Sequence, residues 1–433
     1  MADAESSLTS REPLVDAPPN GGALPEGAVT IAIGLIIAGV ATYAFFRVGA
    51  SALGGDEEFA PIAALWFAMF ALAPGFFLPI EQELGRALAH RRALGYGGGP
   101  VVAKIAILTL VVSVVVVIGL AISAPWLTSS YFSGDWLMFG ALIIGFLSYA
   151  PVHLSRGICS GQGRFTPFAV VVASDGVMKI AGTIALTAIG ITAIGAYAFA
   201  IAVAPLFAVI AVSVRGHLRT NPGPPAQWLE ITQNFGWLLL GTVCAAVLLN
   251  AGPIAANLLA SDSQADTVTR FSYGVLLARV PLFMFQAIQA SLLPRLARLA
   301  AQRSFDEFRR GLRLLVLVVT GIGVAGTIYG ALLGPWTLRL VYNADLTGST
   351  LAMLALSSAL YMMALAISQA VLALEDHAYV ALGWVIALIT FILGTWLSSD
   401  DAFQRIEIGL VASSLAAVTA FGLRLRRRLS ALN

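Results

Sequence analysis

Charged side chains inside long apolar runs are the residues of this sequence that could do chemistry. Lys179 lies within the run from Phe168 to Ile189, and Asp175 precedes it by one helical turn. A charge at the centre of a membrane helix costs about 2.5–3.5 kcal/mol on insertion scales, so it normally faces a partner or a water-filled cavity. Asp175 and Lys179 can neutralise each other on one helix face. The pair therefore either lines a substrate path or is a self-satisfied pair between helices.

A second cation, Arg279, lies in an apolar run that contains no acidic residue to pair with it. Ser272, Arg279 and Gln286 recur every seven residues, so they share one face of a helix. Pro281 follows closely and should kink that helix, because proline lacks the amide hydrogen that the helix needs. An unpaired arginine at membrane depth indicates an aqueous cavity or an anionic ligand.

Polar side chains also share faces in two further apolar runs. Asn250 and Asn257 do so on either side of Gly252-Pro253, and Tyr361 lies one heptad before Ser368. Such residues can bind a substrate's hydroxyl groups, or they can simply hydrogen-bond neighbouring helices. Both interpretations remain open for them.

The elements that position these residues are membrane helices. Hydrophobic residues make up 58% of the 433 residues, charged residues 11%, and the mean hydropathy is +0.87. Apolar stretches of about 17–25 residues recur throughout, each long enough to cross a bilayer as a helix. Continuous runs exclude a β-barrel, whose strands alternate apolar and polar residues. We therefore predict an all-α polytopic membrane protein.

The apolar runs predict twelve spans in two six-helix bundles. The spans are expected near 28–48, 59–80, 101–123, 136–154, 166–190, 192–213, 235–259, 270–293, 314–334, 350–373, 378–397 and 406–423. The two halves share the pattern L-x-R-x-x-A-x-R, at Leu84–Arg91 and at Leu296–Arg303. Repeat-built transporters commonly place their site between two such halves.

Composition also sets the expected domain limits. They are a disordered cytoplasmic N-terminus at 1–27, bundles at 28–213 and 234–423, a proline-containing linker at 214–233 and a basic cytoplasmic tail at 424–433. Most Lys and Arg residues fall in segments that lie inside if both termini are cytoplasmic, and this bias sets orientation. Because topology explains the basic loops, no nucleic-acid partner is expected. His153 is expected at the inner membrane surface.

No metal or redox motif accompanies these features. Cys159 and Cys244 are too far apart in the predicted topology to form a disulfide, and no CxxC or HExxH pattern occurs. No P-loop sequence is present, so the chain should not hydrolyse ATP through that motif. We expect neither a cofactor nor a metal, and we expect a transporter rather than an enzyme.

Several motifs resemble those of one transporter family. The segment from Arg270 through Arg279 and Pro281 to Gln286 and Pro294 resembles the eighth helix of Wzx-type bacterial polysaccharide flippases. These are members of the multidrug/oligosaccharidyl-lipid/polysaccharide (MOP) exporter superfamily, which also contains the MATE transporters. The Asp175–Lys179 spacing resembles the family's fifth helix, and Arg47 has the place of a common family arginine. The segment Gly54–Glu58 departs from the family, which usually has a glycine-aromatic turn there.

The resemblance implies a flippase for oligosaccharides carried on a polyprenyl pyrophosphate, in the bacterial cytoplasmic membrane. The substrate and membrane lipid would be partners, and proteins of polysaccharide assembly are candidates; the oligomeric state is left open. Arginine binds phosphate oxygens with two parallel hydrogen bonds, which suits a cationic cavity used in alternating access. The substrate-binding candidates are Arg47, Asp175, Lys179, Asn250, Asn257, Arg279, Gln286 and Tyr361.

Three alternatives compete with this interpretation. The first is a small-molecule or drug exporter of the same superfamily or of major-facilitator type, although a cation exporter should use cavity carboxylates and Asp175 is the only acid in the middle of a predicted span. The second is a membrane glycosyltransferase or ligase, which needs larger exposed loops than the outer loops predicted here. The third is a scaffold without transport activity, to which charges within the membrane would be an unexplained cost.

Overall fold

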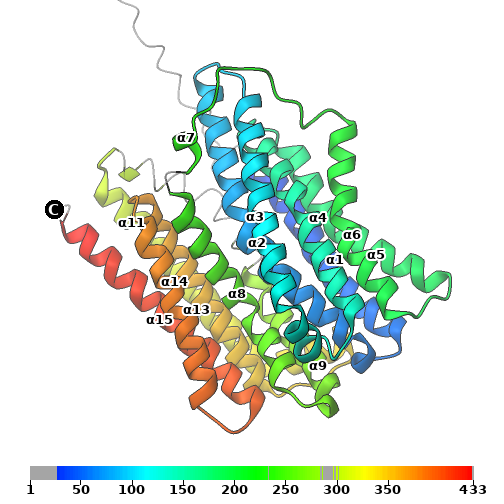
Figure 1. Cartoon of the computed structure of the whole chain (residues 1–433). Helices are drawn as coiled ribbons and strands as arrows, with labels where there is room; N and C mark the ends of the chain where they lie inside the picture. Colours follow the sequence, from blue (N-terminus) through cyan, green and yellow to red (C-terminus); the bar gives the residue numbers. More distant parts are fainter. Residues whose placement is uncertain are drawn as a thin grey trace, which may run out of the picture.

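The described part of the chain is all helical. The computed structural model describes residues 27–232, 234–282, 285, 296, 299–300 and 302–431, and these contain no β-strand. Figure 1 shows the long helices running roughly side by side in two groups. Residues 1–26, which belong to the predicted disordered N-terminus, lie outside the described residues.

The first group is the N-terminal lobe, which we define as helices α1 to α6. Neighbouring helices pack in an interleaved order: α1 lies against α5, and α2 against α4, while α6 contacts both α4 and α5. The last turn of α3 continues as a short π-helical segment, η1. Their bounds are α1 Ala28–Leu53, α2 Asp56–Ala93, α3 Gly99–Trp126, η1 Leu127–Tyr131, α4 Trp136–Gly161, α5 Phe165–Ala188 and α6 Ile194–Val214.

The second group is the C-terminal lobe, which we define as helices α8 to α15. Here α14 packs against α15 and α8, and α13 packs against α11 and α15. A short helix, α7 (Leu229–Thr232), precedes this lobe. The bounds are α8 Phe235–Leu259, the 3₁₀ turn η2 Asp262–Gln264, α9 Ala265–Ala278, α11 Phe305–Leu332, α12 Gly334–Tyr342, α13 Gly348–Ala373, α14 His377–Leu397 and α15 Ala402–Ala431.

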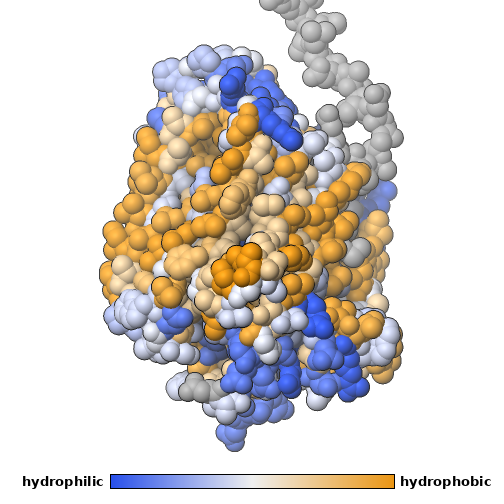
Figure 2. All heavy atoms as spheres, turned by 90° about the vertical axis from the view of Figure 1, so that its right-hand side faces the viewer, coloured by the Kyte–Doolittle hydropathy of each residue, from blue (hydrophilic) through white to orange (hydrophobic). Residues whose placement is uncertain are grey.

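The membrane-spanning character predicted from composition is confirmed. Eleven described helices are long and apolar enough to cross a membrane, and they coincide with eleven predicted spans. The remaining predicted span, 270–293, begins in α9 and continues into residues that are only partly described. Figure 2 shows apolar side chains in a broad band around one face, with hydrophilic side chains gathered at the two ends. The protein is a multi-pass membrane protein.

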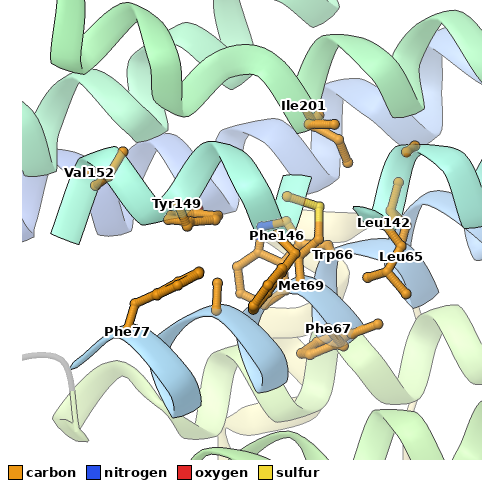
Figure 3. Close-up of a cluster of buried hydrophobic side chains, with 14 of the residues drawn as sticks. Leu65, Trp66, Phe67, Met69, Phe77, Leu142, Phe146, Tyr149, Val152 and Ile201 are labelled. Atoms are coloured by element: carbon orange, nitrogen blue, oxygen red, sulfur yellow. The ribbon is translucent and has the colours of Figure 1, made fainter. Parts of the chain in front are cut away.

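The N-terminal lobe has a core of aromatic and aliphatic side chains between α2 and α4. Phe77 and Phe146 stack with ring centroids 4.7 Å apart, and Trp66 stacks on Phe70 at 4.1 Å. Figure 3 shows Phe67, Phe77, Phe146 and Tyr149 among these buried side chains. Offset aromatic pairs add about 0.5–1.5 kcal/mol each beyond the area they bury. This packing fixes the rotation of α2, which presents side chains to both lobes.

One end of the molecule carries the chain's connections between lobes; we call it the linker end. Figure 1 shows the segment 215–228 and the C-terminal end of α15 on the same upper side. Helix α2 continues beyond the predicted span to Ala93, because the linker pairs its polar last turns. Arg91 donates to the backbone oxygen of Pro224 at 2.7 Å and to Glu230 Oε1 at 3.0 Å. The linker therefore packs onto the N-terminal lobe.

The two lobes pack against each other through α2 and α8, and further contacts join them at the end opposite the linker, which we call the far end. Tyr273 Oη of α9 donates to Asp56 Oδ1 of α2 at 2.8 Å, and Thr269 Oγ1 donates to the Asp56 backbone oxygen at 2.7 Å. Tyr273 also stacks on Tyr342 at 4.3 Å, with Phe46 of α1 against its edge. These contacts hold the lobes together at the far end.

Candidate functional site

Arg279 stands at a break in the helix that follows α8. Helix α9 ends at Ala278, and the Arg279 amide closes a turn on the Leu276 oxygen at 3.0 Å. Pro281 cannot donate the next helical hydrogen bond, so the chain turns before it resumes as a helix. The predicted break beside Pro281 is confirmed. It leaves the arginine side chain at a corner rather than on a regular helix surface.

The Arg279 guanidinium is buried, and its described partners are all neutral. Only 5% of the residue is exposed. Nη1 donates to Asn250 Oδ1 at 3.2 Å, Nη2 donates to the Leu249 backbone oxygen, and the group lies 5.5 Å from the Phe67 ring centroid. Asn250 is oriented by its own donation to the Ala246 oxygen at 2.9 Å. These acceptors satisfy hydrogen bonds, but among the described residues no carboxylate neutralises the charge.

A small cavity, lined mostly by apolar residues with a few hydroxyl groups, adjoins this arginine. Its volume is about 40 Å³, and Tyr361, Ser357 and Ser414 line it together with Arg279. The Tyr361 hydroxyl donates to the Ala245 oxygen at 2.9 Å, which fixes the ring beside the cavity. A space of this size holds about three water molecules. The site is therefore closed around Arg279 in this conformation, and a larger anion requires it to open.

Lys179 occupies a different environment in the N-terminal lobe. Its Nζ lies 2.8 Å from Asp175 Oδ2 and donates to the Tyr149 hydroxyl at 2.7 Å, and Tyr149 in turn donates to the same carboxylate oxygen at 3.0 Å. The ammonium also lies 4.8 Å from the Phe70 ring centroid. Only 4% of Lys179 is exposed. The predicted i to i+4 pair is present, and it is closed into a triangle by a tyrosine from α4.

A second buried ionic cluster escaped the sequence analysis. His153 Nδ1 lies 2.7 Å from Glu81 Oε2, and Arg156 Nη2 lies 3.1 Å from Glu81 Oε1. His153 is 2% exposed, so its side chain is buried between helices. The partner that buries it is 72 residues away on α2. The signal available in the sequence was the pair of acids, Glu81 and Glu83, just after the predicted second span.

The structure gathers some of the remaining candidates and separates others. Asn250, Arg279 and Tyr361 form one site. Arg47 is exposed on α1, and no hydrogen bond or ion pair holds it within the described residues. Asn257 Nδ2 donates to the Tyr131 backbone oxygen at 2.8 Å and so bridges the two lobes near the far end. Gln286 lies outside the described residues.

Sequence comparisons find relatives but no described family. No family model matches the chain. An uncharacterized protein of Mycobacterium tuberculosis (strain ATCC 25618 / H37Rv) is 27% identical over 338 residues, which cover 76% of each chain. An uncharacterized protein of Mycobacterium bovis (strain ATCC BAA-935 / AF2122/97) is 24% identical over 391 residues, covering 86% of this chain and 85% of that protein.

Comparison with solved structures identifies the fold. The outward-facing form of a multidrug resistance MATE family transporter of the MOP superfamily matches 94% of this chain and 96% of its own, with TM-score 0.69 and 14% identity. Its inward-facing counterpart covers 95% and 96%, with TM-score 0.66 and 16% identity. A MOP superfamily transporter from Pyrococcus furiosus Vc1 (DSM3638), described as having a binding pocket of reverse polarity that suggests a different function, covers 94% and 96%, with TM-score 0.67 and 14% identity.

The fold follows from this likeness. The chain has the two-lobed helical fold seen in these MOP superfamily transporters, over nearly its whole length. The predicted fold class is confirmed.

Proposed function

We propose that the protein flips oligosaccharides linked to a polyprenyl pyrophosphate across the bacterial cytoplasmic membrane. The observation that carries the proposal is Arg279, a buried cation whose described partners are neutral. A buried charge without a counter-charge is costly, and an anionic substrate group that pairs with it removes that cost. The Wzx-like segment around Arg279 points to the same substrate class, and the fold shared with MOP superfamily transporters is suited to transport.

The chemistry of the cavity suits a pyrophosphate head group. A guanidinium can offer two parallel N–H donors to phosphate oxygens in place of its present acceptors, the Asn250 side chain and the Leu249 carbonyl. Tyr361, Ser357 and Ser414 add hydroxyls that can bind further phosphate oxygens or the first sugar. The amide of Asn250 would be released for hydrogen bonding when the arginine turns toward the ligand.

Movement between the lobes would open the site further. The cavity is lined by residues of the C-terminal lobe, and on its other side Arg279 lies over the ring of Phe67 of α2 in the N-terminal lobe. Separation of the lobes would remove this ring and enlarge the space beside the guanidinium. If the far end stays held by Asp56 and Tyr273, the lobes would separate toward the linker end. Rocking of two halves about a central site is the common mechanism of repeat-built transporters.

The proposed orientation places the linker end and the C-terminus in the cytoplasm. Arg91, Arg424 and Arg428 lie at that end, and cytoplasmic segments are enriched in Lys and Arg. Single cysteines at positions 424–428 should react with an impermeant thiol reagent only after the membrane is opened. Reaction in intact cells would contradict this orientation.

A cationic drug is a poorer fit to the same cavity. An exporter of cations needs a carboxylate within reach of its substrate, and the described residues that line the Arg279 cavity include no aspartate or glutamate. Arg279 itself would repel a cation at close range, since little solvent is present to screen the charges. The neighbour from Pyrococcus furiosus Vc1, described as having a pocket of reverse polarity, shows that one fold accommodates different pockets.

The direct test is translocation in proteoliposomes, using a fluorescent polyprenyl-pyrophosphate disaccharide. Arg279→Gln should abolish flipping, while Arg279→Lys should keep a fraction of it, because lysine retains the charge but loses the two-pronged geometry. Arg339→Gln is the matched control, since Arg339 is an exposed arginine of the same lobe. Near-normal flipping by Arg279→Gln, at equal protein per vesicle, would refute the proposal.

A further inference from the structure

A large apolar groove runs between α9, α11 and α13. Its volume is about 540 Å³, and Gly274, Leu277, Gly326, Ala355 and Met362 are among the residues that line it. Small residues make most of the floor, so the backbones of these helices come close to the surface of the groove. Volumes between about 300 and 1,000 Å³ are typical of sites for small molecules. The groove lies on membrane-spanning helices, and its lining offers few polar groups.

This groove adjoins the Arg279 cavity. Ala278 and Ser358 line both spaces, so the apolar groove and the cavity beside the guanidinium are neighbours that share a wall. Ala278 is the last residue of α9, and Arg279 is the next residue in the chain. The break at Arg279 thus turns the guanidinium toward the cavity while the preceding helix borders the groove. Together they form an amphipathic site with a cationic head and an apolar arm.

We propose that this groove holds the part of the isoprenoid chain nearest to the pyrophosphate, while Arg279 holds the pyrophosphate itself. The inference rests on the proposed function and deepens it by assigning a place to the lipid. A free acyl lipid also fits an apolar groove, but the shared wall with a cationic cavity favours a single ligand that carries both an anion and a chain. Such a ligand would have its charge in the protein and the remainder of its tail in the membrane.

The groove would orient the lipid more than it would add affinity. Hydrocarbon chains of the membrane are as apolar as the groove, so moving an isoprenoid chain into it yields little hydrophobic free energy. What it gains is close van der Waals contact and one fixed direction for the chain. Filling the groove should therefore weaken binding moderately, and only for ligands that possess the chain.

Helix α11 offers a matched pair of glycines for the test. A Cβ atom built on Gly326 meets no atom within 4 Å, so leucine can enter the groove there without a clash at its first carbon. Gly321 is equally open, lies on the same helix and is not part of the groove lining. Gly326→Leu and Gly321→Leu therefore change helix propensity and hydrophobicity alike, and differ in whether they fill the groove.

The measurement is binding of two probes to the purified full-length protein: a long-chain polyprenyl diphosphate and inorganic pyrophosphate. Gly326→Leu should lower the affinity for the polyprenyl diphosphate about tenfold, which corresponds to about 1.4 kcal/mol, and leave the affinity for pyrophosphate unchanged. Gly321→Leu should change neither, and Arg279→Gln should weaken both. Wild-type affinity of Gly326→Leu for the long-chain probe would overturn the groove assignment while leaving the proposed function intact. Equal binding of both probes by Arg279→Gln and wild type would instead refute the proposed function.

A second measurement does not depend on filling the groove. Benzoylphenylalanine in place of Ile322, which lines the groove, should crosslink to a labelled polyprenyl diphosphate on illumination. The same replacement at Ile328, which is exposed on α11 and outside the groove lining, is the control. Excess unlabelled polyprenyl diphosphate should suppress the crosslink at 322. Equal labelling at both positions would mean that bulk membrane lipid occupies the groove, and would overturn the assignment.

Discussion

The two lobes each bury a cation within the membrane, and they treat it differently. Lys179 in the N-terminal lobe has a carboxylate at 2.8 Å and a tyrosine hydroxyl that contacts both charges. Arg279 in the C-terminal lobe has an amide oxygen and a carbonyl oxygen. The same segment of α2 faces both, since Phe70 contacts Lys179 and Phe67 contacts Arg279.

The difference separates a structural charge from a binding charge. A buried ion pair neutralises its own charge and needs no ligand to do so, and removing one member leaves the other unpaired. A buried cation with neutral acceptors keeps its positive potential and can still attract an anion. On this basis we propose that the Asp175–Lys179 pair fixes α5 against α4 and α2, whereas Arg279 is the group that would meet the substrate.

The largest effect should come from breaking the Lys179 triangle. Lys179→Ala leaves the Asp175 carboxylate buried without its counter-charge and should destabilise the protein by about 3–5 kcal/mol. Folded yield in detergent, measured by size-exclusion chromatography, should fall sharply. The double variant Asp175→Ala with Lys179→Ala removes both charges and should restore most of the yield and the flipping activity. A double variant that folds well but does not transport would show that the pair serves the substrate, and would break the comparison.

A smaller effect is expected at the far end, where the lobes are joined. Tyr273→Phe removes one hydrogen bond to the Asp56 carboxylate, a bond worth about 1.5–3 kcal/mol when one partner is charged. The equilibrium should shift toward states open at the far end, by roughly tenfold or more. Spin labels on α2 and α9 near this end should report a larger population of long distances. An unchanged distance distribution would mean that this contact does not hold the far end closed.

The smallest effect concerns Asp376, between α13 and α14 at the linker end. Burial disfavours ionisation of this carboxyl, but hydrogen bonds from Arg424 at 2.6 Å and Arg428 at 3.0 Å outweigh it and hold the Asp376 pKa below its usual 3.8. The Asp376 carboxylate contributes its full stabilisation of the folded protein above the ordinary pKa of 3.8, and this stabilisation is lost as pH falls through the lowered pKa. Asp376→Asn keeps an acceptor oxygen and should cost about 1 kcal/mol at neutral pH.

A thermal melt of Asp376→Asn alongside the wild type checks this prediction. The two melting curves should differ at neutral pH, begin to approach each other below pH 3.8, and converge as the pH falls through the lowered pKa, where the carboxyl of the folded protein becomes protonated. Flipping by Asp376→Asn should be near normal, since Asp376 does not line the Arg279 cavity. A difference in melting temperature between the two proteins that grows toward low pH would contradict this explanation.

Local features were predictable from the sequence because they depend on near neighbours. Apolar length predicted the spans, the i to i+4 spacing predicted the Asp175–Lys179 pair, and Pro281 predicted the break at Arg279. The polar end of α2 was missed because its last turns are stabilised by the linker, more than a hundred residues further along the chain.

Partners from distant helices were beyond reach for the same reason. His153 faces Glu81 across two helices, and Asp56 lies in the segment that departs from the resembled family, yet it accepts the hydrogen bond of Tyr273. The neutral partners of Arg279 were equally hidden, since Asn250 is a candidate for binding sugar hydroxyls and in this conformation accepts a hydrogen bond from the arginine. Helix packing decides which polar residues contact each other, and these contacts are not evident from the residue pattern of a single sequence.

The most direct test of the comparison is to measure anion binding in both cation variants side by side. Purified Arg279→Gln and the double variant Asp175→Ala with Lys179→Ala should be titrated with polyprenyl diphosphate by calorimetry under identical conditions. Two charge-assisted hydrogen bonds at about 1.5–3 kcal/mol each predict at least a hundredfold loss of affinity for Arg279→Gln. The double variant should bind like the wild type. Loss of binding in the double variant with binding retained by Arg279→Gln would contradict the account.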